Sequence, residues 1–174
     1  MASKGTYVDD GAQEIYMASS QAGVATSTGL STTQTGFTLT NPYGSGKTLV
    51  ILQANVAFTT APAAAATLVL TANVNPVATA VVQTTPLTVR KANLGVAGSG
   101  VGLAASAVTL PAAPVVVRGL GGPVATGSVS QMQINDKIEG ALCVAPGCAI
   151  SINSLTTTIR GVISMIWKEI PEIA

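Results

Sequence analysis

From Gly36 to the C-terminus, the chain alternates between short apolar runs and turn signals. Residues 48–58, 66–74 and 161–170 are such runs, rich in Val, Ile, Leu and Thr. Asn-Pro, Pro-Gly and Gly-Gly pairs separate the runs, at intervals of roughly eight to twelve residues. The sequence after residue 35 has no clear helical period. This pattern predicts an all-β protein, built as an antiparallel sandwich or barrel.

Two runs have a more specific expected place. The run bounded by Asn75-Pro76 and Pro86 is expected at a sheet edge, because proline cannot donate a ladder hydrogen bond. Residues 161–170 are expected to form a core strand, with one face meeting the core and the other a second layer or subunit. Alternation places Ile163, Met165, Trp167 and Glu169 on one face and Val162, Ser164, Ile166 and Lys168 on the other, and either set can meet the core.

Residues 1–35 have a different character from the rest of the chain. They contain three of the seven acidic residues and two of the three tyrosines. A short helix is predicted over residues 12–18, capped by Asp9 or Asp10, followed by a polar connector. We interpret residues 1–35 as an N-terminal arm and residues 36–174 as the sandwich domain. The arm carries apolar groups that suit an interface better than solvent, namely Tyr7, Ile15, Tyr16 and Met17.

The charge content argues for a surface that is covered by partners. Only 9% of the 174 residues are charged, against roughly 25% in a typical soluble domain. A free monomer with so little charge tends to associate, so we expect a homo-oligomer. The cations form no basic stripe, no apolar run reaches the ~18 residues of a membrane span, and the start lacks a secretion signal. We therefore expect no nucleic-acid partner, no membrane partner, and synthesis in a cytoplasm.

Residues 41–48, NPYGSGKT, end like a phosphate-binding loop. That loop needs a glycine where Asn41 stands, and the next residue, Pro42, has no N–H to offer a phosphate. It also needs a helix after the lysine, whereas residues 48–58 have the composition of a strand. We therefore predict a hairpin turn in which Gly44 and Gly46 adopt positive φ.

The chemical groups present speak against catalysis. The chain has no histidine, which excludes Ser-His and Cys-His nucleophile systems. Asp136 and Glu139 are expected in a solvated turn, and Glu169 and Glu172 at a solvated chain end. We predict no enzyme activity, no catalytic residues, no cofactor and no metal.

The two cysteines, Cys143 and Cys148, flank a Pro-Gly turn. A disulfide across that turn is conceivable, but strand alternation points Cys143 away from the face that carries Cys148. A cytoplasmic origin also disfavours the bond. We therefore predict free thiols.

Two stretches carry a resemblance to a known family. Residues 36–51, GFTLTNPYGSGKTLVI, resemble a strand, an Asn-Pro-X-Gly-Ser-Gly turn and an apolar strand of small virion structural proteins of tailed bacteriophages. Residues 142–152 and 161–171, LCVAPGCAISI and GVISMIWKEIP, resemble the ending of the same proteins. The resemblance implies a β-sandwich of jelly-roll type, a tendency to form trimers, and no catalytic residues.

The expected function is therefore structural. The resemblance implies an accessory protein located in the virion, a decoration or cement protein of the capsid or a tail accessory protein. Its partners would be itself and other virion proteins, such as the major capsid protein or tail components. The alternative is a receptor- or glycan-binding head domain of a virion fibre, but the chain has few aromatic residues on which sugars could stack.

Overall fold

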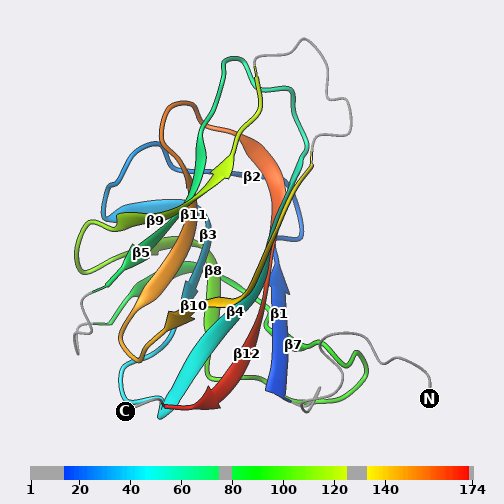
Figure 1. Ribbon diagram of the computed structural model, residues 1–174, viewed down its shortest axis with the longest axis vertical. Coiled ribbons are helices and arrows are strands. Elements are labelled where there is room, and N and C mark those ends of the chain that lie inside the picture. The colour runs from blue at the N-terminus through cyan, green and yellow to red at the C-terminus, as the bar shows by residue number, and fades with distance from the viewer. Residues whose placement is uncertain (1–13, 75–79, 125–132, 173–174) are drawn as a thin grey trace.

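The computed structural model describes residues 14–74, 80–124 and 133–172, in which the chain forms strands and connecting segments around two sheets (Figure 1). The first sheet contains β1 (Ile15–Ser19), β2 (Val24–Ala25), β4 (Lys47–Phe58), β7 (Arg90–Lys91), β10 (Gln133–Val144) and β12 (Arg160–Pro171). The second contains β3 (Thr33–Thr40), β5 (Leu68–Asn73), β6 (Val82–Leu87), β8 (Leu103–Thr109), β9 (Val115–Gly121) and β11 (Ala149–Ser154). The strand pairs within both sheets are antiparallel. The prediction of an all-β antiparallel sandwich is confirmed.

The strand order explains where each element lies. The first sheet runs β10-β4-β12-β1-β7, with β2 also paired to β12, and the second runs β6-β8-β3-β11-β5-β9. The chain changes sheet between β3 and β4, between β4 and β5, and at each connection from β9 to β12. The turns at residues 41–46 and 145–148 therefore join the two sheets, and the expected hairpin at residues 41–46 is wrong. The expected edge strand is confirmed, since β6 ends one side of the second sheet.

The core lies between the inner faces of the two sheets. The alternation predicted for residues 161–170 is confirmed, because the four residues of the first face are 0–3% exposed and those of the second are partly exposed. The second sheet contributes its own alternating apolar residues to the same core. The largest of these side chains are Phe37, Leu39, Leu68, Leu70, Ile150 and Ile152.

The N-terminal region differs from the prediction. Residues 15–19 form strand β1, paired with β12 on one side and β7 on the other, so the predicted helix is wrong for them. Residues 14–35 belong to the sandwich and include the start of β3, which differs from the expected arm over residues 1–35. For these residues a strand paired in the sheet is more stable than a solvated arm, because it buries apolar groups that the arm would expose. Residues 1–13, which include Asp9 and Asp10, lie outside the described residues.

Candidate interaction surfaces

The expected interface residues belong largely to the core. Ile15 is 4% exposed and Tyr16 5% exposed, so both are buried within their own chain. The Tyr16 ring packs against the Trp167 indole, with ring centroids 6.3 Å apart. Met17 is partly exposed and pairs with Ile166 on β12 and Arg90 on β7. Ile15 and Tyr16 are therefore covered by their own chain and are not available as anchors for a neighbour. Tyr7 lies outside the described residues.

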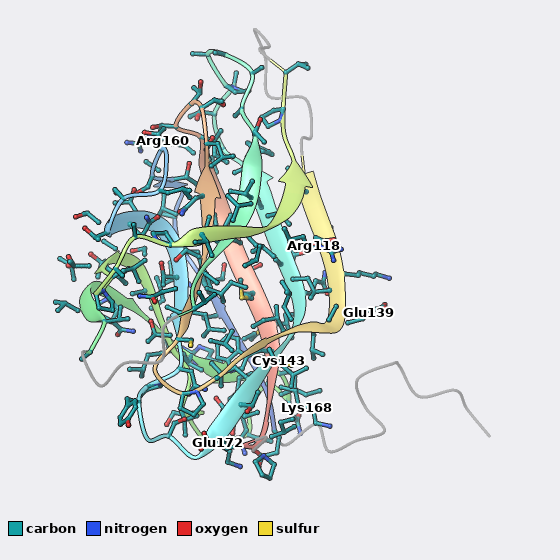
Figure 2. The ribbon with its side chains drawn as sticks, turned by 60° about the vertical axis from the view of Figure 1, so that its left-hand side comes forward. Arg118, Glu139, Cys143, Arg160, Lys168 and Glu172 are labelled. Carbon is teal, nitrogen blue, oxygen red and sulfur yellow. The ribbon has the colours of Figure 1, made fainter. Side chains whose placement is uncertain are left out.

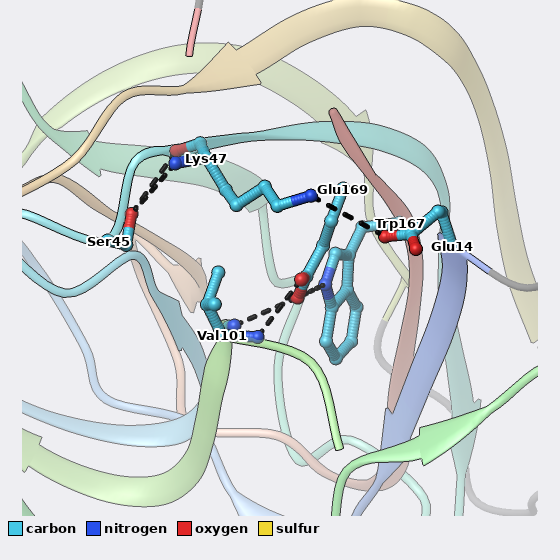
Figure 3. A network of polar contacts seen from close by, with 7 residues as sticks. Glu14, Ser45, Lys47, Val101, Trp167 and Glu169 are labelled. Carbon is cyan, nitrogen blue, oxygen red and sulfur yellow. Dashed lines mark hydrogen bonds and ion pairs between the residues drawn. The ribbon is translucent and has the colours of Figure 1, made fainter. Parts of the chain in front are cut away.

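A buried carboxylate fixes the segment that leads into β8 (Figure 3). Glu169 is 3% exposed, so the expectation of a solvated end is wrong for this residue. The backbone N–H groups of Val101 and Gly102 donate to its carboxylate at 3.0 and 2.9 Å, and the Trp167 indole N–H donates at 3.2 Å. Charge-assisted hydrogen bonds of this kind hold a buried carboxylate firmly. The face shared by Glu169 and Trp167 was visible in the sequence; the donors from residues 101 and 102 were not.

Residues 100–102 approach the Glu169 carboxylate so closely that position 100 requires glycine. A Cβ atom added to Gly100 would lie 2.1 Å from the Glu169 Oε1 atom. A side chain at residue 100 would therefore displace the carboxylate or the loop. The cluster ties residues 100–102 to the end of β12 and is structural in character.

The turn at residues 41–46 is held by one asparagine side chain. The Asn41 amide Nδ2 donates to the carbonyls of Lys47 at 2.7 Å and Val144 at 2.9 Å, and its Oδ1 accepts from the Ser45 hydroxyl at 2.7 Å. Gly44 and Gly46 adopt φ of 72° and 65°, as predicted.

The surroundings of Lys47 differ from those of a phosphate-loop lysine. Its Nζ lies 3.8 Å from the Glu14 Oε2, in a partly exposed pair (Figure 3). The segment after the turn is β4, so the helix of a phosphate-binding loop is replaced by a strand.

An apolar groove opens where β9 and β10 end their respective sheets. It has a volume of about 250 Å³ and is lined by residues that include Val74, Val117, Leu142, Cys143, Cys148 and Ile150. Next to it, β9 exposes three successive valines, Val115, Val116 and Val117, by 47%, 44% and 38%. An edge strand with unpaired backbone groups and exposed apolar side chains is suited to pairing with another chain. This surface is formed by residues that the sequence did not single out as interface residues.

Both cysteines line this groove as free thiols, as predicted. Cys143 is exposed, while Cys148 is partly buried and burial raises the pKa of its thiol. Cys143 lies on β10 in the first sheet and Cys148 just precedes β11 in the second. Cys143 is thus carried by a strand of the first sheet, and Cys148 by the turn that leads into the second.

An ion pair spans the same open side of the sandwich. Arg118 on β9, labelled in Figure 2, binds Asp136 on β10 through two contacts, of 2.7 Å from Nε and 3.1 Å from a terminal guanidinium nitrogen. Asp136 is part of β10, so its expected place in a solvated turn is wrong. Glu139 does lie at an irregularity: the register with β4 shifts between Lys137 and Leu142, and Glu139 has a φ of 52°. Arg118 and Asp136 therefore link the edges of the two sheets.

The remaining chemistry of the described ranges is sparse. Within residues 14–74, 80–124 and 133–172, no three His, Cys, Asp or Glu side chains form a group that could hold a metal ion. The search for long apolar helices found none that could cross a membrane in these ranges. Among the aromatic residues described, Tyr43 is 64% exposed, whereas Phe37, Phe58 and Trp167 are buried.

Comparison with known proteins gave no match to any family model, any curated protein or any solved structure. The fold and its surfaces define an all-β antiparallel sandwich protein with an apolar open edge between β9 and β10.

Proposed function

We propose that this protein is a structural accessory component of a tailed-phage virion, decorating or cementing the capsid or forming part of the tail region. The observation that carries the proposal is the apolar groove beside the exposed valines of β9. Soluble monomers seldom leave an edge strand with several exposed apolar side chains uncovered. A protein that functions inside an assembly has neighbours to cover it.

Sandwich topology adds support to this proposal. The repeated change of sheet from β3 to β5 and from β9 to β12 is compatible with a jelly roll, in which the chain wraps back and forth between two sheets. The resemblance of residues 36–51 and 142–171 to small virion proteins favours the same assignment. In this role the chain forms a homo-oligomer, for which the resemblance implies a trimer. It also contacts other virion proteins, such as the major capsid protein or tail components.

The glycan-binding alternative receives less support. Sugars stack on exposed aromatic faces, and among the described aromatic residues Tyr43 alone is largely exposed. The aromatic residues of the described chain therefore favour the structural role over glycan binding.

The direct test is to purify virions from the infected cells in which this chain is made. Cryo-electron microscopy is expected to show density that fits the sandwich on the head or tail. Absence of the chain from purified particles by mass spectrometry would contradict the proposal.

Self-association through β9 can be tested separately by light scattering. Val116→Lys is expected to dissociate the oligomer, because it places a charge at the centre of the valine surface. Val82→Lys is the matched control, since Val82 is 60% exposed on β6 at the opposite edge of the same sheet. A monomeric wild-type protein, or equal effects of the two variants, would refute association through β9.

A further inference from the structure

A basic pocket lies at the β7 edge of the first sheet, away from the groove between β9 and β10. It has a volume of about 140 Å³, and its lining includes Arg90, Lys91, Leu94, Val96 and Gly98. None of its lining residues is acidic, and neither Arg90 nor Lys91 belongs to the ion pairs Lys47–Glu14 and Arg118–Asp136 of the described residues. The pocket therefore carries two cations and, in its lining, no acidic residue.

The loop after β7 folds back onto the lysine side chain. A Cβ atom added to Gly98 would lie 2.7 Å from the Lys91 Cε and 3.3 Å from its Nζ. The ammonium group is thus held against the loop. On the same loop, Leu94 and Val96 are 71% and 46% exposed, so the pocket combines two cations with two exposed apolar side chains.

The sheet register directs the N-terminal segment toward this pocket. Strand β1 pairs antiparallel with β7, with Tyr16 opposite Lys91 and Met17 opposite Arg90. The Ala92 N–H donates to the Ile15 carbonyl at 2.8 Å, so the start of β1 already lies beside the loop. Asp10 lies five positions before Ile15, and five residues of extended chain span at most about 18 Å. Residues 7–10 are therefore within reach of the pocket of their own chain.

The charged and apolar residues of the N-terminal segment are complementary to those of the pocket. Asp9 and Asp10 are the only adjacent pair of acidic residues in the sequence, and Arg90 and Lys91 are the only adjacent pair of cations. Tyr7 and Val8 precede the two acids, as Leu94 and Val96 follow the two cations. We propose that residues 7–10 of the same chain dock in this pocket, with Asp9 and Asp10 at Arg90 and Lys91, and Tyr7 and Val8 against Leu94 and Val96. Docking there covers the short β7 edge of the sheet.

The first experiment is zero-length carbodiimide cross-linking of the full chain, followed by mass spectrometry. An amide bond between Lys91 and Asp9 or Asp10 is expected, and 0.5 M NaCl is expected to suppress it because exposed ion pairs are screened by salt. An equal mixture of ¹⁴N- and ¹⁵N-labelled protein distinguishes docking within one chain from docking onto a second copy. Cross-links within one isotope support the proposal, whereas mixed-isotope cross-links place the segment on a second copy and overturn it.

The second experiment follows amide hydrogen exchange over residues 7–13 in the variant R90Q/K91Q. Exchange is expected to accelerate about threefold, the scale of one or two exposed ion pairs. Lys137→Gln is the control, because Lys137 is an exposed cation on β10 at the opposite edge of the same sheet. Exchange in R90Q/K91Q that matches the wild type would overturn the docking, whatever cross-links form.

Discussion

The outer faces of the two sheets carry similar polar residues but are buried to different degrees. In the first sheet, Asn135, Asn55, Ser164 and Ser19 form a row across β10, β4, β12 and β1, and each is at least partly exposed. In the second sheet, Thr38, Ser151 and Thr71 form a row across β3, β11 and β5, and are 0–2% exposed. Alternating polar residues therefore mark the outer face of both sheets, but they do not determine whether that face is exposed, as in the first sheet, or buried, as in the second.

The difference comes from a chain connection. Strands β8 and β9 lie on opposite sides of β3, β11 and β5, and residues 110–114 connect them. Leu110 of this connection packs with Ala105, Val108 and Ala149, and Val81 packs against the same cluster. This apolar cluster covers part of the outer face of the second sheet, where buried polar groups then need partners. Thr38 and Ser151 bond each other at 2.8 Å, and Asn153 donates to Thr71 at 2.8 Å.

The largest expected effect separates the two faces of one strand. Ile163→Ala is expected to lower the free energy of unfolding by about 2–5 kcal/mol, because Ile163 is fully buried on the inner face of β12. Ile166→Ala is the matched variant on the outer face, where the side chain is partly exposed, and is expected to cost about 1 kcal/mol or less. Urea unfolding measures both. Equal losses would mean that the outer face of the first sheet is as well covered as the core.

A matched pair of serines compares the two outer faces directly. Ser151→Ala is expected to cost about 1–3 kcal/mol, because it removes the buried partner of the Thr38 hydroxyl. Ser164→Ala is expected to change stability by about 0.5 kcal/mol or less, since its 3.4 Å contact with Asn55 lies on the partly exposed face. Unfolding in denaturant tests the pair. Similar values would show that the covering of the second sheet is energetically unimportant.

A smaller effect distinguishes a tyrosine inside the sandwich from one on its surface. Burial first, and then the charges of Glu14 and Glu169, raise the pKa of Tyr16 above its ordinary value of 10.0. The folded protein thus holds this proton more tightly than the unfolded chain, so stability is expected to fall as pH rises above about 10. Tyr16→Phe is expected to reduce that alkaline loss, while Tyr43→Phe, at an exposed site, is expected to leave it unchanged. Unfolding curves between about pH 8 and 11 give the comparison; identical losses in both variants would contradict it.

Local sequence signals predicted more of the fold than of the surfaces. Alternation along residues 161–170 assigned both faces of β12 correctly, and proline placed β6 at an edge. The same alternation grouped Glu169 with Ile163, Met165 and Trp167, but the expectation of a solvated end was wrong, because its carboxylate is bonded by N–H donors 67 and 68 residues away along the chain. Ile15 and Tyr16 were correctly seen as apolar groups in need of cover. Pairing with β12 and β7, rather than a neighbouring subunit, provides that cover.

By itself, the sequence determined the features that depend on near neighbours along the chain. The β class, the period-two faces and the positive φ of Gly44 and Gly46 follow from side-chain chemistry within a few residues. Tertiary structure alone decided which sheet each strand joins, which outer face is covered, and that the groove, the Arg118–Asp136 pair and the basic pocket form at sheet edges. These features depend on contacts between residues far apart in the chain. Their free energy comes from burial and pairing across the whole sandwich, which no short stretch of sequence encodes.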